Sequence, residues 1–130
     1  MGMTMVEKIL ARHAGRESVV PGEYVWAKID ETNAMTDTFE ALESLGVTSV
    51  WDPDRVYCVS DHSAPPANIG TAESVKKLRA YMEKYHIKNW FEYGRHGIVH
   101  QLNPEKGFCR HGEHIAMIDS HSTTYGAFNA

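Results

Sequence analysis

Three stretches of the chain carry apolar residues at the spacing of an amphipathic helix. The first covers residues 4–15, where Thr4 and Glu7 have capping-box spacing and Gly15 is a suitable stop. The second covers residues 37–46, and the third and longest covers residues 71–85. The buried faces predicted for these two helices are Phe39, Leu42 and Leu45, and Val75, Leu78 and Met82.

Short runs of β-branched and aromatic residues between the helices predict strands. They lie at residues 24–29, 47–51, 56–60, 90–93 and 115–118, with a short extended piece at 98–100. Loops are predicted at residues 63–70, which contain two prolines, and at 107–112. Strands alternating with amphipathic helices predict an α/β fold with a largely parallel sheet flanked by helices. No repeat or linker divides the sequence, so we expect one domain segment over residues 1–130.

The composition is that of an ordinary globular protein, with 130 residues of which 42% are hydrophobic. No apolar run approaches the roughly 20 residues that cross a bilayer. The formal charge of −4 offers no basic stripe to a nucleic acid. Cys58 and Cys109 are too few for a disulfide framework, so a reducing cytoplasm is the expected location, and Cys58 is predicted to be a small buried hydrophobe. We therefore expect neither a membrane nor a nucleic acid as partner.

Two predicted strands end in dense polar clusters, Asp61-His62 and Asp119-Ser120-His121. Ligands of parallel α/β sheets bind beyond the carboxyl ends of the strands, so we expect the two clusters to converge there. An aspartate beside a histidine can fix the imidazole tautomer for general acid–base work, provided that the chain turns at that point. His100, four residues after His96, is a further candidate. The histidines without such context are expected on the surface, and these are His13, His86, His111 and His114.

Three chemistries fit these residue types. Aspartate and histidine could ligate the metal of a mononuclear hydrolase, although no defined ligand spacing is present. Ser120 could be the nucleophile of a Ser-His-Asp triad, although the Gly-x-Ser-x-Gly elbow is missing. Histidines could also protonate the leaving hydroxyl of a hydroxy acid while a serine binds its carboxylate. Composition and spacing leave all three open.

The sequence around these candidates resembles the aconitase superfamily. The matching stretches are Asp61-His62, Gly97-Ile98-Val99-His100-Gln101, Pro104-Glu105-Lys106-Gly107 and the block from Asp119 to Phe128, in the family's order and spacing. Residues 7–15 and 52–56 resemble the large subunits of the 3-isopropylmalate dehydratase branch and its homoaconitase-type relatives. The resemblance runs over nearly the whole chain and implies the first domain of an aconitase-type fold.

The resemblance implies a hydro-lyase that moves a hydroxyl group of a hydroxy di- or tricarboxylic acid through an alkene. In that role His62, oriented by Asp61, would protonate the departing hydroxyl. His100 and His121 would line the water site, Asp119 would hold the histidine network, and Ser120 would bind a substrate carboxylate. A [4Fe–4S] cluster would act as Lewis acid, and a serine on a separate small subunit or swivelling domain would remove the carbon-bound proton.

Departures from the family pattern qualify this picture. The family's cluster cysteines lie downstream in a pattern ending in Cys-x-x-Cys, and we expect neither Cys58 nor Cys109 to be a cluster ligand. Residues 30–38 lack the usual element that contacts substrate, for which Asn33 is the substitute we expect. We therefore expect a truncated, inactive N-terminal segment of the catalytic subunit, with no metal ligand of its own. The alternative is a free-standing, non-catalytic module that binds a carboxylate or a partner.

Overall fold

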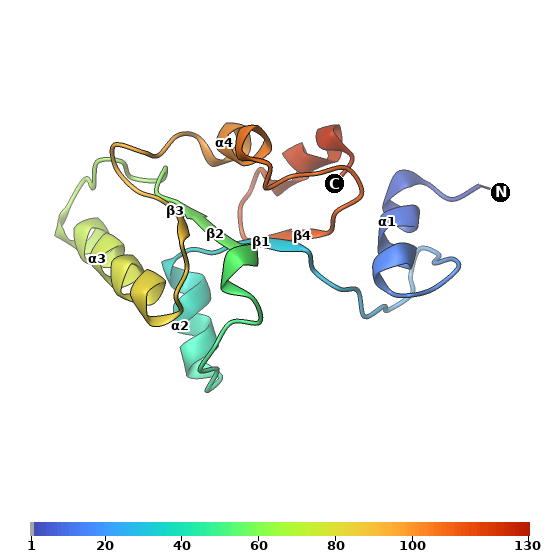
Figure 1. The fold of residues 1–130 in the computed structure, drawn as a ribbon, viewed down its shortest axis with the longest axis horizontal. Helices are drawn as coiled ribbons and strands as arrows, with labels where there is room; N and C mark the ends of the chain where they lie inside the picture. Colours follow the sequence, from blue (N-terminus) through green and yellow to red (C-terminus); the bar gives the residue numbers. More distant parts are fainter. Residues whose placement is uncertain (1) are drawn as a thin grey trace.

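The centre of the molecule is a parallel sheet of four strands in the order β3-β2-β1-β4 (Figure 1). The structure is a computed structural model, and it describes residues 2–130. All neighbouring strands in the described residues run parallel, which confirms the predicted α/β architecture. The strands are β1 (Glu31–Asn33), β2 (Val56–Val59), β3 (Asn89–Phe91) and β4 (Ile115–Met117).

Helices cover both faces of this sheet (Figure 1). Two of them, α2 and α3, lie together on one face, whereas α4 and the C-terminal 3-10 helix lie on the other. The first helix, α1, lies beyond the β4 edge of the sheet. The bounds are α1 (Met5–His13), α2 (Thr36–Ser44), α3 (Ile69–Lys84) and α4 (Val99–Lys106), with 3-10 turns at Pro53–Arg55 and Ser122–Phe128.

Strand β2 divides its side chains between two hydrophobic clusters because successive residues of a strand point to opposite faces. Val56 and Cys58 pack under α2 and α3, whereas Val59 packs under α4. The larger cluster also contains Ala34, Phe39, Leu78, Met82, Tyr85 and Ile87. Cys58 is 1% exposed, which confirms its predicted place in the core. All four residues of β2 are buried, as expected for an inner strand of a sheet that is covered on both faces.

The three predicted helices are confirmed with small shifts at their ends. Helix α1 begins after the predicted capping box, in which Glu7 Oε2 accepts from the Thr4 amide and Thr4 Oγ1 accepts from the Glu7 amide. Helix α2 begins at Thr36, one residue before the predicted start. The Thr38 hydroxyl accepts a hydrogen bond from the free backbone amide of Met35. Helix α3 begins at Ile69, because the Asn68 side chain caps it through the amide of Thr71.

Two predicted strands are wrong. Residues 24–29 have no regular secondary structure, no strand among the described residues pairs with them, and the side chains of Tyr24 and Trp26 are fully exposed. Residues 47–51 form bends and irregular chain, in which Val50 packs on the larger cluster and Trp51 remains 59% exposed. Both segments have the residue types of a strand but lack the neighbour that a ladder requires.

The predicted extended piece at 98–100 is also wrong, since Val99 is the first residue of helix α4. Ile98 offers no side-chain cap, and the Asp61 carboxylate accepts from the Val99 amide at 2.8 Å instead. Val99 and Leu102 form the apolar face of this helix and are buried against the sheet.

No helix within residues 2–130 combines the length and the apolar character required to cross a membrane.

Candidate functional site

The two polar clusters converge at the carboxyl edge of the sheet, as predicted. Asp61 and His62 follow β2, and Asp119, Ser120 and His121 follow β4. Helix α4 adds His100 from its first turn. An open cavity of about 240 Å³ lies between these segments, and its walls are Asp61, His62, Ile98, His100, Asp119 and His121.

Asp119 is the centre of this cluster, with a side chain only 5% exposed. Its Oδ1 accepts from the His121 backbone amide at 2.7 Å and from His100 Nε2 at 2.8 Å. Its Oδ2 lies 3.5 Å from His62 Nε2. The amide of His121 and the imidazole of His100 stabilise the carboxylate, and they lower the pKa of Asp119 from its ordinary value of 3.8 despite burial. Asp119 therefore stays ionised and holds residues of three segments together.

Asp61 fixes the orientation of His62. The chain turns directly after Asp61, so its Oδ1 accepts from His62 Nδ1 at 2.8 Å. With the proton held on Nδ1, His62 Nε2 faces the cavity and Asp119. The His62 side chain is 59% exposed and the Asp61 side chain 14%. This is a histidine in a fixed tautomer whose second nitrogen is open to a ligand.

The remaining predicted residues occupy less direct positions. Ser120 Oγ lies 2.9 Å from His121 Nδ1, and both residues are exposed. Asn33, at the end of β1, is 4% exposed, and its Nδ2 is buried without a partner. Neither Ser120 nor Asn33 lines the cavity around Asp119, so their contact with a ligand remains a prediction.

The geometry does not form a Ser-His-Asp triad. In a triad the serine and the aspartate bind opposite nitrogens of the imidazole. Here Ser120 Oγ and Asp119 Oδ1 both lie on the Nδ1 side of His121, at 2.9 and 3.8 Å. The imidazole therefore cannot pass a proton between them as the triad mechanism requires.

A metal site of His100, Asp119 and His121 is possible by distance alone, since their ligand atoms lie within 4.8 Å of one another. A histidine that ligates a metal usually donates its other N–H to a carboxylate or carbonyl. The Nδ1 of His100 is buried and has no partner, and Asp119 Oδ1 already accepts two hydrogen bonds. His100 therefore lacks the second hydrogen bond that usually orients a histidine ligand of a metal.

Of the four histidines predicted at the surface, two are exposed and two are not. His114 is half-buried, and its Nδ1 lies 2.8 Å from the Lys28 carbonyl. His86 and His111 are exposed, as expected. His13 is not a surface residue: its side chain is 8% exposed, and its ring nitrogens lie 2.7 Å from the Ile9 carbonyl and 2.5 Å from Asp30 Oδ2. This contact joins α1 to the segment before β1, at the opposite end of the strand from the candidate site.

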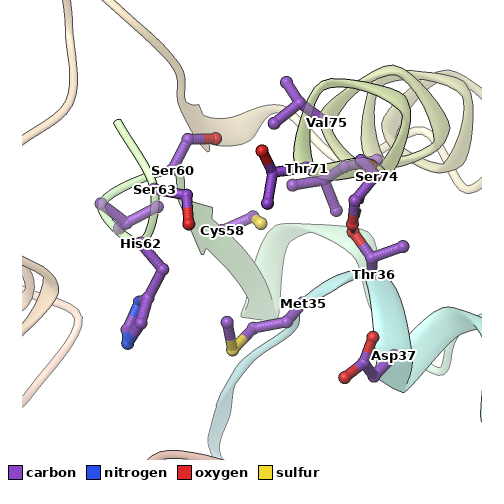
Figure 2. A pocket seen from close by; sticks show the side chains of 12 residues that line it. Met35, Thr36, Asp37, Cys58, Ser60, His62, Ser63, Thr71, Ser74 and Val75 are labelled. Carbon is purple, nitrogen blue, oxygen red and sulfur yellow. Dashed lines mark hydrogen bonds between the residues drawn. The ribbon is translucent and has the colours of Figure 1, made fainter. Parts of the chain in front are cut away.

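Sequence reasoning missed a second cavity beside His62, of about 220 Å³ (Figure 2). Its walls come from the start of α2, the end of β2 and the first half of α3. Serine and threonine in the first turn of a helix are typical caps, so the sequence gives no separate signal for a ligand there.

Comparisons with known proteins agree with this picture. The family described as "Aconitase family (aconitate hydratase)" matches residues 8–130. The chain is 46% identical over its whole length to the 3-isopropylmalate dehydratase large subunit of Thermodesulfovibrio yellowstonii, of which it covers 32%. It is 43% identical, again over its whole length, to the large subunit of the same name from Aquifex aeolicus, of which it covers 31%. The chain thus spans about a third of the length of these curated relatives.

Proposed function

This chain belongs to the aconitase family, and we propose that it supplies the histidine wall of the active site of a hydro-lyase. The substrate class is a hydroxy di- or tricarboxylic acid of the 3-isopropylmalate type, which loses and regains water across neighbouring carbons. The observation that carries the proposal is the convergence of His62, His100 and His121 on the buried carboxylate of Asp119.

In this function His62 is the general acid. The form that acts is the imidazolium: Nε2 faces the cavity and gives its proton to the departing hydroxyl, and the ring is left neutral with its remaining proton on Nδ1, bound to Asp61. His100 and His121 line the water and hydroxyl site, and Asp119 holds both. Ser120 binds a substrate carboxylate, and Asn33 takes the place of the substrate-contacting element that residues 30–38 lack.

The residues present do not fit an iron–sulfur cluster. Such clusters are held by cysteine thiolates, and this chain has two cysteines, both buried and both free. Burial raises the pKa of Cys58 to about 12, and it also raises the pKa of Cys109. The proposal therefore assigns the ligands of a [4Fe–4S] cluster to sequence outside these 130 residues. Sequencing the gene beyond the codon for Ala130 tests this: a frame continuing to Cys-x-x-Cys supports it, and a stop codon there contradicts it.

The proposal also assigns the proton-abstracting serine to a separate small subunit, the counterpart implied by the "large subunit" of the relatives' names. The chain alone is then expected to bind the acid without dehydrating it. Alkene formation from 3-isopropylmalate by the purified chain, followed by ultraviolet absorbance, would contradict this division of roles.

Binding is tested by titrating the chain with 3-isopropylmalate and recording the imidazole signals of His62, His100 and His121 by NMR. We expect these signals to move, and we expect His62→Ala to weaken binding. His86→Ala is the matched control, because His86 is exposed and lies outside the cavity. Imidazole signals that stay unchanged when 3-isopropylmalate is added, or equal affinities of the two variants for it, would overturn the proposed function.

A further inference from the structure

The second cavity combines several hydroxyl groups with apolar walls (Figure 2). Five of its residues carry a hydroxyl, and these are Thr36, Ser60, Ser63, Thr71 and Ser74. Met35, Val75 and Leu78 add apolar walls, and the buried Cys58 lies at the end of the strand between them. At about 220 Å³ the cavity has the volume of several water molecules, each taking about 30 Å³. It therefore admits one end of a small molecule rather than a nucleotide.

Three of these five hydroxyls are hydrogen-bonded, and of the other two only that of Ser60 is buried. Ser74 Oγ donates to Thr36 Oγ1 at 3.1 Å, and Thr71 Oγ1 donates to the Asn68 carbonyl at 2.9 Å. Ser60 is 7% exposed, and its Oγ is buried without a hydrogen-bond partner. A buried hydroxyl normally has a partner, because leaving it unpaired is unfavourable by about 1–3 kcal/mol. The Ser60 hydroxyl is thus an unpaired hydrogen-bond donor beside the cavity.

The electrostatics of the cavity favour an anion as that acceptor. Thr36 is the first residue of α2 and Thr71 the third residue of α3, so two helix N-termini meet at the cavity. The positive end of a helix dipole stabilises a carboxylate within its first turn. The one acidic residue in the lining, Asp37, is exposed and lies across the cavity from Ser60 in Figure 2.

The position of the cavity connects it with the candidate active site. His62 lines both cavities. Ser60 lies two residues before His62, and a chain spans at most about 3.6 Å per residue, so the two residues are neighbours at the carboxyl end of β2. Met35, Thr36 and Asp37, on the opposite wall, belong to residues 30–38, the segment that departs from the family pattern.

We propose that this cavity is a carboxylate subsite, which binds the end of the hydroxy acid away from the reacting carbons through the unpaired hydroxyl of Ser60, beside the N-termini of α2 and α3. This inference rests on the proposed function, since it names where the same substrate places its second charged group. It makes residues 35–37 and Ser60 determinants of substrate choice.

The test is an amide NMR titration of the 130-residue chain with 3-isopropylmalate and, separately, with acetate as a minimal carboxylate. We expect the amides of Ser60, Ser63 and Thr71 to move with both probes. Ser60→Ala should weaken binding about tenfold or more, because a hydrogen bond to a charged group contributes about 1.5–3 kcal/mol. Ser74→Ala is the second variant, and Ser44→Ala, at the exposed far end of α2, is the matched control.

Each outcome separates this inference from the proposed function. If 3-isopropylmalate moves the signals of His62 and His100 but not those of Ser60 and Thr71, the subsite is wrong and the proposed function stands. If both probes move only the cavity amides, the subsite stands and the proposed function is wrong. If neither set moves, both are wrong. Affinities unchanged by Ser60→Ala and Ser74→Ala, with folded spectra, also overturn the subsite.

Discussion

Asp119 offers the sharpest test of how the candidate site is held together. Replacing Asp119 by alanine removes the acceptor of two hydrogen bonds, from the His121 amide at 2.7 Å and from His100 Nε2 at 2.8 Å. A hydrogen bond to a charged group contributes about 1.5–3 kcal/mol when it is buried. The His121 bond is exposed, so water replaces part of it, and the His100 bond is partly buried. We therefore expect Asp119→Ala to lower the free energy of unfolding by about 3 kcal/mol.

The isosteric variant separates charge from shape. Asp119→Asn keeps a carbonyl oxygen that can accept both hydrogen bonds and loses only the charge, so we expect a loss of about 1 kcal/mol. Because the folded-state pKa of Asp119 is lowered, the stability it contributes is present above its ordinary pKa of 3.8 and is lost as the pH falls through the folded value. The difference between wild type and Asp119→Asn should therefore be constant near neutral pH and should shrink below pH 3.8.

Urea unfolding followed by tryptophan fluorescence measures these differences. Asp54→Ala is the matched control, because Asp54 is exposed and accepts no hydrogen bond through its carboxylate. Surface substitutions of this kind change stability by about 0.5 kcal/mol or less. If Asp119→Ala were no more destabilising than Asp54→Ala, the view of Asp119 as the centre of the cluster would be refuted.

Three further predictions concern the rest of the molecule. Arg55→Met should lower the free energy of unfolding by about 3 kcal/mol at pH 7, because it leaves the 3%-exposed Glu31 without its ion pair. Burial raises the pKa of Glu31 above its ordinary 4.5, and removal of Arg55 raises it further, so this loss should fade as the pH falls towards 4.5 and should be small at pH 4. A loss equal at pH 4 and pH 7 in urea unfolding would contradict this prediction. Cys58 should resist iodoacetamide in the native chain and react at once in urea, and mass spectrometry showing equal rates would refute its burial. Thr4→Ala should remove about 1 kcal/mol from the N-terminus of α1, seen as faster amide exchange confined to that helix; unchanged exchange would discount the cap.

The site residues were predictable because they follow strands directly. Asp61 and Asp119 each end an apolar strand pattern, and the carboxyl ends of parallel strands share one edge of the sheet. The strand pattern and the parallel topology were therefore sufficient to predict that both clusters lie at the same edge of the sheet. The strand pattern alone did not predict that Asp119 holds the histidine network, which only the family resemblance implied, since its partner His100 lies in helix α4, where the pattern predicted extended chain.

The errors arise where structure depends on a distant partner. The residues at 98–100 favour extended chain locally, but the Asp61 carboxylate, 38 residues earlier, caps Val99 and allows a helix to start. The residues at 24–29 have strand-forming side chains, but a ladder needs a neighbour, and none is present within the described part of the chain. The local sequence pattern shows which secondary structure a segment can adopt, whereas a contact with a distant residue or strand decides whether the segment adopts it.

The Asp61 carboxylate links the end of one strand to the start of a distant helix. Its Oδ1 holds His62 Nδ1 and its Oδ2 holds the Val99 amide, both at 2.8 Å, so the end of β2 and the start of α4 are fixed to each other. Because His100 follows Val99, both imidazoles are then aimed at Asp119, but unequally: His100 Nε2 lies at 2.8 Å and His62 Nε2 at 3.5 Å. His100 is committed to that hydrogen bond and is 18% exposed, whereas His62 is 59% exposed and has the weaker contact. This difference supports the proposed role of His62 rather than His100 as the general acid, since an imidazolium at His62 can give its Nε2 proton to a bound hydroxyl without breaking the cluster.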